Sequence, residues 1–241
     1  MQPPHLIARD LYRLLVSGRM NGAIMNVFVS GSTGYLGRAM IGKLLSRGHA
    51  VRALARPASL DRVPEGATAV IGDALDPSTF ADALSNTTTL VHLVGTPHPV
   101  PSKAAEFQRV DLASIRSSVE AARRASIAHL VYVSVAQPAP VMRAYVDARA
   151  MGEAAIVEAK LTATMLRPWY VLGPGHWWPI ALKPVYWLAE KLPATRETAR
   201  RMGLVTLAQM VAALVQAVEH PPACGTACIV EVPGIRAARL S

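Results

Sequence analysis

Cysteine, long apolar runs and acidic residues are all scarce in this chain of 241 residues. The two cysteines, Cys224 and Cys228, are too few for a disulfide framework and are typical of a protein kept in a reducing cytoplasm. No uninterrupted apolar run approaches the ~18 residues that a bilayer-spanning helix needs. The sequence therefore predicts a soluble, cytoplasmic protein without a transmembrane segment, and 51% hydrophobic residues are enough to bury a full core.

The shortage of acidic residues leaves 16 of them against 25 lysines and arginines, a formal net charge of +9. A basic stripe interleaved with aromatic residues would indicate nucleic-acid binding, but the arginines are spread over several expected helices. We therefore predict a solvated basic surface and no nucleic-acid partner. We also predict no metal site, because Pro221 and Pro222 separate His220 from the two cysteines and no fourth ligand lies nearby.

The residues before Asn26 differ from the rest of the chain. Leu11, Leu14 and Leu15 have helical spacing, and Gly18 is a stop signal. An accessory amphipathic helix, a leader, and upstream sequence from an early start codon are three open interpretations. We assign no role to this extension, residues 1–25.

Strand and helix patterns alternate from Asn26 onward, which is typical of a parallel sheet covered by helices on both faces. Seven short, valine-rich runs are the expected strands: 27–30, 50–55, 68–71, 89–94, 129–134, 162–167 and 228–232. Five segments are the expected helices: 36–47, 76–84, 104–124, 142–160 and 206–220. With no internal repeat, this predicts an α/β fold: one doubly wound Rossmann domain over residues 26–235, with a less regular substrate-side insertion at 173–204 and a tail at 236–241.

The stretch "VFVSGSTGYLGRAM", residues 27–40, places Gly31, Gly34 and Gly37 between the first expected strand and the first expected helix. Helix N-termini carry unsatisfied N–H groups and a positive partial charge, so this turn can hold a pyrophosphate when no side chain blocks the approach. Gly31 permits the tight turn, Gly34 the close approach, and Gly37 the packing of helix on strand. The other residues of the turn are expected at the same ligand: Ser32, Thr33, Tyr35 and Leu36. A tight turn without a ligand is the alternative, but the strand–turn–helix setting favours a dinucleotide.

In its G-x-x-G-x-x-G spacing the chain resembles the short-chain dehydrogenase/reductase superfamily, in particular the extended and atypical branches that include the NmrA-like redox sensors. Three further segments carry the resemblance: "GDALDP", "LVHLVGTPHP" and "LRPWYVLGPG". By this resemblance they supply Asp73 and Ala74 beside the adenine, Val94, Gly95 and Thr96 along the cofactor, and Pro168 and Val171 beside the nicotinamide. The similarity covers most of residues 26–235 and implies the fold and a nicotinamide cofactor, but not the substrate.

The second expected strand ends without the acidic residue that usually holds the adenine ribose of NAD. "AVRALARPAS" offers Arg52 and Arg56 instead, and a guanidinium can grip a ribose phosphate through paired N–H groups. We therefore predict NADP as the cofactor, with NAD as the alternative. Arg56 is the main candidate for the phosphate; Arg52 is equally well interpreted as a solvent-facing strand residue, and Arg38 is a weaker candidate.

The resemblance also implies a catalytic tyrosine, a lysine four residues later, and a serine after the fifth strand. Tyr145 and Ser134 occupy the matching places, and Arg149 stands where the lysine would be. One helical turn separates Tyr145 from Arg149, so both face the same way. Arginine can donate to ribose hydroxyls, yet it cannot join a relay by losing its proton. Tyr145 is therefore either the proton donor or a residue that covers the cofactor, and Ser134 either completes the site or is a turn residue. His92 and His129 lie in expected strands and are interpreted as packing residues.

Aromatic residues are concentrated between Trp169 and Trp187, although they make up only 5% of the chain. They predict an apolar pocket for a hydrophobic carbonyl compound or a quinone, while a satellite core or contact with a membrane surface are open alternatives. The leading hypothesis is an NADP-dependent oxidoreductase. The alternatives are a non-catalytic NADP(H) sensor that acts on a protein partner and a cofactor-bearing subunit of a larger assembly.

Overall fold

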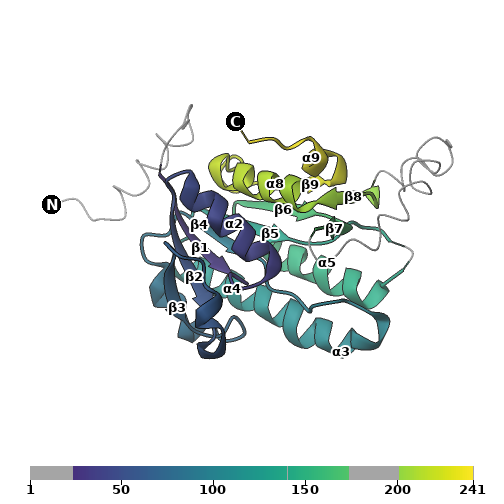
Figure 1. The fold of residues 1–241 in the computed structure, drawn as a ribbon. Coiled ribbons are helices and arrows are strands. Elements are labelled where there is room, and N and C mark those ends of the chain that lie inside the picture. The colour runs from purple at the N-terminus through teal and green to yellow at the C-terminus, as the bar shows by residue number, and fades with distance from the viewer. Residues whose placement is uncertain (1–23, 140, 174–200, 241) are drawn as a thin grey trace.

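A computed structural model describes residues 24–139, 141–173 and 201–240. Seven parallel strands form its central sheet in the order β3-β2-β1-β4-β5-β6-β9 (Figure 1). Their bounds are β1 Asn26–Ser30, β2 Ala50–Ala55, β3 Thr68–Ile71, β4 Thr89–His92, β5 His129–Val133, β6 Ala163–Arg167 and β9 Ala227–Glu231. All seven expected strands are present, and the predicted Rossmann-type α/β fold is confirmed. A small parallel pair, β7 (Tyr170–Leu172) with β8 (Leu204–Thr206), was not expected.

Helices cover both faces of the sheet (Figure 1). On one face lie α2 (Tyr35–Ser46), α8 (Leu207–Glu219) and α9 (Val232–Ala237), and on the other α3 (Ala104–Glu106), α4 (Ala113–Arg124) and α5 (Arg143–Glu158). Because side chains alternate along a strand, Val27 and Val29 pack toward the α2 and α8 layer, whereas Phe28 packs toward α4. Both faces are therefore apolar, which explains the continuous hydrophobic runs of the strands.

The helix expected over residues 76–84 was a wrong prediction, because two 3₁₀ turns replace it: η2 (Pro77–Thr79) and η3 (Ala81–Leu84). Asp76 caps the first turn, and its carboxylate accepts from the Ser78 N–H at 3.0 Å. Phe80 interrupts the helix with a φ of −140°. The break lets its ring enter the core and stack on Phe28, with ring centroids 5.8 Å apart.

The segment expected as a helix over residues 104–124 is helical throughout, but its N-terminal half contains a π-helical turn, η5 (Phe107–Leu112). π-helical turns are rare and are frequent at functional sites. Here the turn directs Phe107, Asp111 and Leu112 into the protein interior. Two further 3₁₀ turns, η1 (Pro57–Arg62) and η4 (Pro101–Lys103), lie after β2 and before α3.

Several expectations concern the ends of the domain. The boundary expected at residue 235 falls inside α9, and Ala238 packs in the core with 7% of its surface exposed. Of the extension 1–25, residues 1–23 lie outside the described residues, as do 174–200 of the expected insertion. No helix in the described ranges is long and apolar enough to cross a bilayer.

A polar network ties α2, β2 and α8 together far from the glycine turn. Arg47 donates from Nε to Glu219 Oε1 at 2.6 Å, and His49 Nε2 lies 3.0 Å from the same oxygen. Burial works to raise the pKa of Glu219, but its hydrogen bonds with Arg47 and His49 outweigh that effect and lower it. This network stabilises the fold at the edge of the sheet opposite the glycine turn.

Candidate functional site

The order in which strands are added to the sheet reverses between β1 and β4, because the chain runs from β1 out to β2 and β3 before β4 pairs in parallel with β1 on its other side. Ligands of doubly wound proteins bind at this point, beyond the carboxyl ends of the strands. Gly31 follows β1 there with a φ of +78°, a conformation that disfavours side chains. A Cβ on Gly31 would lie 2.7 Å from the carbonyl carbon of Leu93, after β4. Glycine is therefore required for the two loops to meet.

The other two glycines of the turn differ in what surrounds them. A Cβ on Gly37 would lie 2.3 Å from the carbonyl oxygen of Gly31, so Gly37 is required for packing. Gly34 is exposed, and among the described residues an added Cβ would find only the Gly31 oxygen within 4 Å, at 3.2 Å. Gly34 is also the N-cap of α2 and provides no capping side chain. Gly34 therefore places no side chain over the N–H groups of the first helical turn, which fits a pyrophosphate.

The remaining residues of the turn are placed in different ways. Ser32 is fully buried and its hydroxyl donates to the Leu54 carbonyl at 2.6 Å, so it points into the fold and not toward the expected phosphate. Thr33 is half-buried in the turn, and Leu36 packs on the core. Tyr35, the first residue of α2, lies against Gly173, where a Cβ would lie 1.4 Å from the tyrosine hydroxyl oxygen.

The arginines proposed for the ribose phosphate differ in whether the protein itself engages their side chains. Arg56 follows β2 directly, its side chain is exposed, and no hydrogen bond or ion pair engages that side chain within the described part of the chain. Arg52 instead donates from Nη1 to the carbonyl oxygens of Ala83 and Ser85, at 2.7 and 2.6 Å. The structure thus gives Arg52 a structural role beside η3. Arg38 is exposed on α2.

The segment after β3 lies at the same edge of the sheet as Arg56, because β2 and β3 are parallel neighbours. Asp73 is exposed, and its carboxylate accepts from the Leu75 N–H at 3.0 Å. Ala74 packs half-buried on the core. These positions fit an adenine wall, since Asp73 is fixed by its own loop and Ala74 offers an apolar surface.

Arg149 is 5% exposed, and the structure engages its guanidinium within the protein. Nη2 donates to Asp111 Oδ1 at 2.6 Å and Nη1 donates to the Val133 carbonyl at 2.9 Å. Asp111 is fully buried, and its second oxygen accepts from the Thr96 N–H at 3.0 Å and the Thr96 hydroxyl at 2.6 Å. A Cβ on Gly95 would lie 2.1 Å from Arg149 Nη2. Arg149 therefore holds a protein carboxylate where the sequence analysis expected it to hold a ribose.

Asp111 was missed by the sequence analysis. The signal was present, because an acidic residue stands four positions from Phe107 and four from Ile115, both on the buried side of the helical segment. A carboxylate on an apolar helix face needs a buried partner. Arg149, on the opposite helix, is that partner.

Tyr145 and Ser134 lie near this pair at the carboxyl edge of the sheet. The Tyr145 ring packs edge-on against Phe107 with ring centroids 5.1 Å apart, and Arg149 Cζ lies 5.2 Å from the Tyr145 ring centroid. Ser134 follows β5 and is 2% exposed, and its hydroxyl has no hydrogen-bond partner among the described residues. An unsatisfied buried hydroxyl costs ~1–3 kcal/mol, so this position fits a group that a bound molecule would satisfy.

The charge states of the site follow from burial. Burial disfavours the charged guanidinium, but the Tyr145, Tyr132 and Asp111 oxygens outweigh it, so the pKa of Arg149 is raised. His92 is fully buried, and burial and the charge of Arg149 lower its pKa to about 3. Its Nδ1 lies 2.9 Å from the Ser118 hydroxyl. Arg149 is therefore a permanent cation, and His92 is a neutral core residue.

His129 behaves in the same way in β5. Its Nε2 lies 3.0 Å from the Thr164 hydroxyl, and burial lowers its pKa to about 4. The predicted packing role of both strand histidines is thus confirmed. Cys224, Cys228 and His220 are exposed, and no group of three metal-binding side chains occurs in the described ranges.

The link between β6 and β7 passes the segment that follows Ser134. Pro168 is buried and its carbonyl accepts from the Ala136 N–H at 2.9 Å. Val171, in β7, packs against the core. Trp169 is half-buried, and the aromatic-rich stretch beyond Gly173 lies outside the described residues. Val94 is half-buried beside Gly31 at the switch point.

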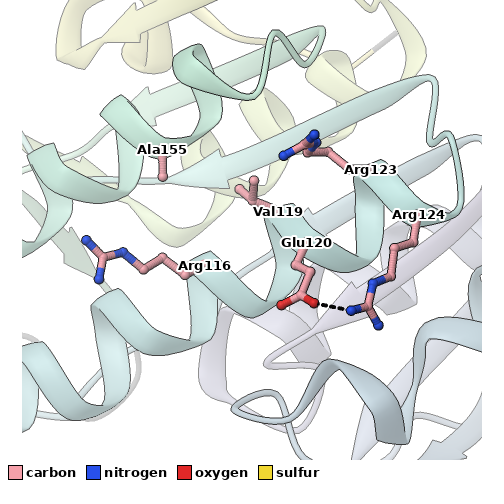
Figure 2. A pocket seen from close by; sticks show the side chains of 6 residues that line it. All are labelled: Arg116, Val119, Glu120, Arg123, Arg124 and Ala155. Carbon is pink, nitrogen blue, oxygen red and sulfur yellow. Dashed lines mark hydrogen bonds and ion pairs between the residues drawn. The ribbon is translucent and has the colours of Figure 1, made fainter.

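Two surface hollows differ in position. One of about 520 Å³ adjoins the β5–α5 connection and is lined in part by Gln137, Arg143 and Asp147. The other, of about 430 Å³, is a groove between α4 and α5 that is lined by Arg116, Val119, Glu120, Arg123, Arg124 and Ala155, with Glu120 paired to Arg124 (Figure 2). Because α4 runs back from the carboxyl edge, its last turn with Arg123 and Arg124 lies away from the glycine turn. The groove is part of the basic surface and separate from the candidate site.

Comparison with known proteins identifies relatives of this arrangement. A family model described as NAD(P)H-binding matches residues 31–174. A 3-diazoavenalumate denitrifying reductase from a Streptomyces species is 33% identical over 225 residues, which cover 81% of this chain and 72% of that protein. A ceramide reductase from Caulobacter vibrioides is 28% identical over 180 residues, 72% of this chain, and the match spans 55% of the relative's length.

Solved structures agree with the fold. A short-chain dehydrogenase/reductase superfamily protein from Agrobacterium tumefaciens, with bound NAD, superposes with a TM-score of 0.62 at 19% identity. The match covers 86% of this chain and 77% of that one. The likeness confirms the Rossmann-type fold, and the family model over residues 31–174 confirms the predicted NAD(P)-binding relationship.

Proposed function

Because the chain belongs to the NAD(P)H-binding family and is reductase-like, we propose that it is an NADP(H)-dependent oxidoreductase acting on a hydrophobic carbonyl compound or quinone. The observation that carries the proposal is the cleared main chain at Gly34, beside the first turn of α2. Packing requires glycine at residues 31 and 37, whereas Gly34 is exposed and an added Cβ would meet one main-chain oxygen, at 3.2 Å, among the described residues. A diphosphate supplies the negative charge that this helix terminus favours.

The residues of the site divide between the two halves of such a cofactor. The α2 N-terminus would hold the pyrophosphate, and exposed Arg56 would hold the phosphorylated ribose by paired N–H groups. Residues 94–96 would run along the nicotinamide half, toward Ser134 and Tyr145. When bound, NADPH supplies the hydride for a carbonyl carbon.

Tyr145 and Ser134 would act on the substrate oxygen. Tyr145 donates its phenolic proton to that oxygen, so a carbonyl that accepts a hydride leaves as an alcohol. The Ser134 hydroxyl, buried and otherwise unsatisfied, donates a hydrogen bond to the same oxygen. Arg149 keeps a positive charge beside the Tyr145 ring, where it stabilises negative charge that develops in the transition state.

Calorimetry tests the proposal. Wild-type protein is expected to bind NADPH more tightly than NADH, and Arg56→Ala to weaken NADPH binding by about tenfold, since one charge-assisted contact is lost. Arg56→Ala should leave NADH binding unchanged. Arg116→Ala, which removes the same charge from the α4 groove, is the matched control and should change neither affinity. Absence of heat with either nucleotide at millimolar concentration would overturn the proposal.

A non-catalytic NADP(H) sensor is the second candidate, and the engagement of Arg149 by Asp111 favours it. In that case the protein binds NADPH but does not oxidise it with any member of a panel of quinones, ketones and aldehydes. Turnover with any member of the panel assigns the oxidoreductase function and excludes the sensor. A cofactor-bearing assembly subunit would also lack turnover, and it would copurify with its partners from native extract.

A further inference from the structure

The ion pair between Asp111 and Arg149 is a separate feature from the charge that Arg149 places beside Tyr145. Asp111 joins three elements, because it lies in η5, accepts two hydrogen bonds from Thr96 after β4, and pairs with Arg149 in α5. Thr96 belongs to the segment that would run along the cofactor. The position of that segment therefore depends on a carboxylate that lies inside the protein.

We propose that Asp111 and Arg149 form one positioning unit, in which Arg149 serves the cofactor site through Asp111 and does not contact the cofactor ribose. Two observations carry the inference. Nη1 and Nη2 of Arg149 donate to Val133 and Asp111, at 2.9 and 2.6 Å, and its Nε, which has no hydrogen-bond partner among the described residues, is buried. Its side chain is 6% exposed and that of Asp111 is fully buried.

The surroundings of Gly95 explain how the unit acts on the loop. Arg149 Nη2 occupies the space that a side chain at residue 95 would need, so the loop lies directly on the guanidinium. Asp111 then fixes the next residue, Thr96, through both its N–H and its hydroxyl. The guanidinium neutralises the buried carboxylate, and without it the carboxylate would have to be protonated or exposed. The inference rests on the proposed binding of NADP(H) and specifies how the loop along it is held.

A double-mutant cycle separates positioning from direct contact. Arg149→Met leaves Asp111 unpaired, and Asp111→Asn leaves Arg149 unpaired. The double variant removes both charges, and the Asn oxygen can still accept from Thr96. We expect each single variant to weaken NADPH binding by about tenfold or more, and the double variant to bind within about threefold of wild type, because residues in contact couple strongly.

The matched control is the pair Arg47 and Glu219, which also joins two helices but lies at the other end of the sheet. Arg47→Met, Glu219→Gln and their combination should change the melting temperature and leave the NADPH dissociation constant unchanged. If Asp111 and Arg149 had a purely structural role, their variants would likewise change the melting temperature and leave the NADPH dissociation constant unchanged. Thermal melting of every variant identifies those that remain folded.

The outcomes are distinct. If Arg149→Met and the double variant lose the same affinity, Arg149 contacts the cofactor directly and the inference is wrong. If no variant changes the NADPH affinity, the pair is structural only, and the inference is wrong as well. If a single variant does not fold, the NADPH affinity of the double variant alone tests the inference: binding within about threefold of wild type supports it, and a larger loss contradicts it. If wild-type protein binds neither nucleotide, the proposed function fails and the positioning role falls with it.

Discussion

Replacing Gly34 or Gly37 by alanine separates ligand approach from packing within one turn. In Gly37→Ala the new Cβ would lie 2.3 Å from the Gly31 carbonyl oxygen and 2.7 Å from that of Ser32, both main-chain atoms. The helix must shift, and overpacking of this kind costs ~2 kcal/mol. For a chain of this size that lowers the melting temperature by about 4–8 °C. Gly34→Ala meets one oxygen at 3.2 Å and has a φ of −74°, which alanine adopts readily, so its melting temperature should stay close to that of wild type.

The NADPH affinity, unlike the melting temperature, should fall in Gly34→Ala. The methyl group of Gly34→Ala occupies the side of the turn where a phosphate would approach, and loss of one charge-assisted hydrogen bond weakens NADPH binding roughly 10- to 100-fold. Thermal melting and calorimetry on the same samples measure both effects. A folded Gly34→Ala protein with wild-type affinity would show that the open space beside α2 is not a phosphate site. An unchanged melting temperature for Gly37→Ala would refute the packing argument.

Two more predictions follow from buried and site residues. Acid should destabilise the fold: His92 and His129 have pKa values of about 3 and 4 in the folded protein against 6.5 when unfolded, so unfolding takes up protons below about pH 6.5. The free energy of unfolding should fall by ~4 kcal/mol between about pH 8 and pH 5, and urea titrations should find about half that fall in His129→Gln. An equal fall in the variant would contradict this assignment. Tyr145→Phe should lower kcat at least ~100-fold in any quinone or carbonyl reduction that the protein catalyses, with the NADPH dissociation constant unchanged. Retained turnover would remove Tyr145 from the proton-donor role.

The sequence predicted the sheet well, because buried parallel strands are short and apolar and the glycine turn marks where the first of them ends. Boundaries of α2 and α8 were expected to within a residue or two, since Gly48 and the two prolines after His220 are strong stop signals. The failure at residues 76–84 has a tertiary cause, because the core placement of Phe80 overrides local helix preference. The spacing of apolar residues along the sequence does not reveal that the Phe80 ring packs in the core.

The sequence indicated where the candidate site lies in the fold, but not which hydrogen-bond partners its side chains have. Ser134, Tyr145 and Arg149 were expected together, and Tyr145 and Arg149 do lie together. What could not be read from the sequence was the direction of Arg149, which depends on the π-helical turn that carries Asp111. The direction of the Ser32 hydroxyl could not be read from the sequence either, because it donates to the carbonyl of Leu54 in the neighbouring strand. Hydrogen-bond partners far apart in sequence are fixed by the assembled fold.

The contact between Gly31 and the chain after β4 restricts how this protein can diversify. Because a Cβ on Gly31 would lie 2.7–2.9 Å from main-chain atoms of Leu93 and Val94, residue 31 cannot gain a side chain without displacing the segment after β4. Under the proposed oxidoreductase function, new substrate preferences are therefore expected to arise from segments beyond β5 and β6, which do not share that contact. Laboratory evolution of altered selectivity should accumulate changes there and leave the junction of the first and fourth strands untouched.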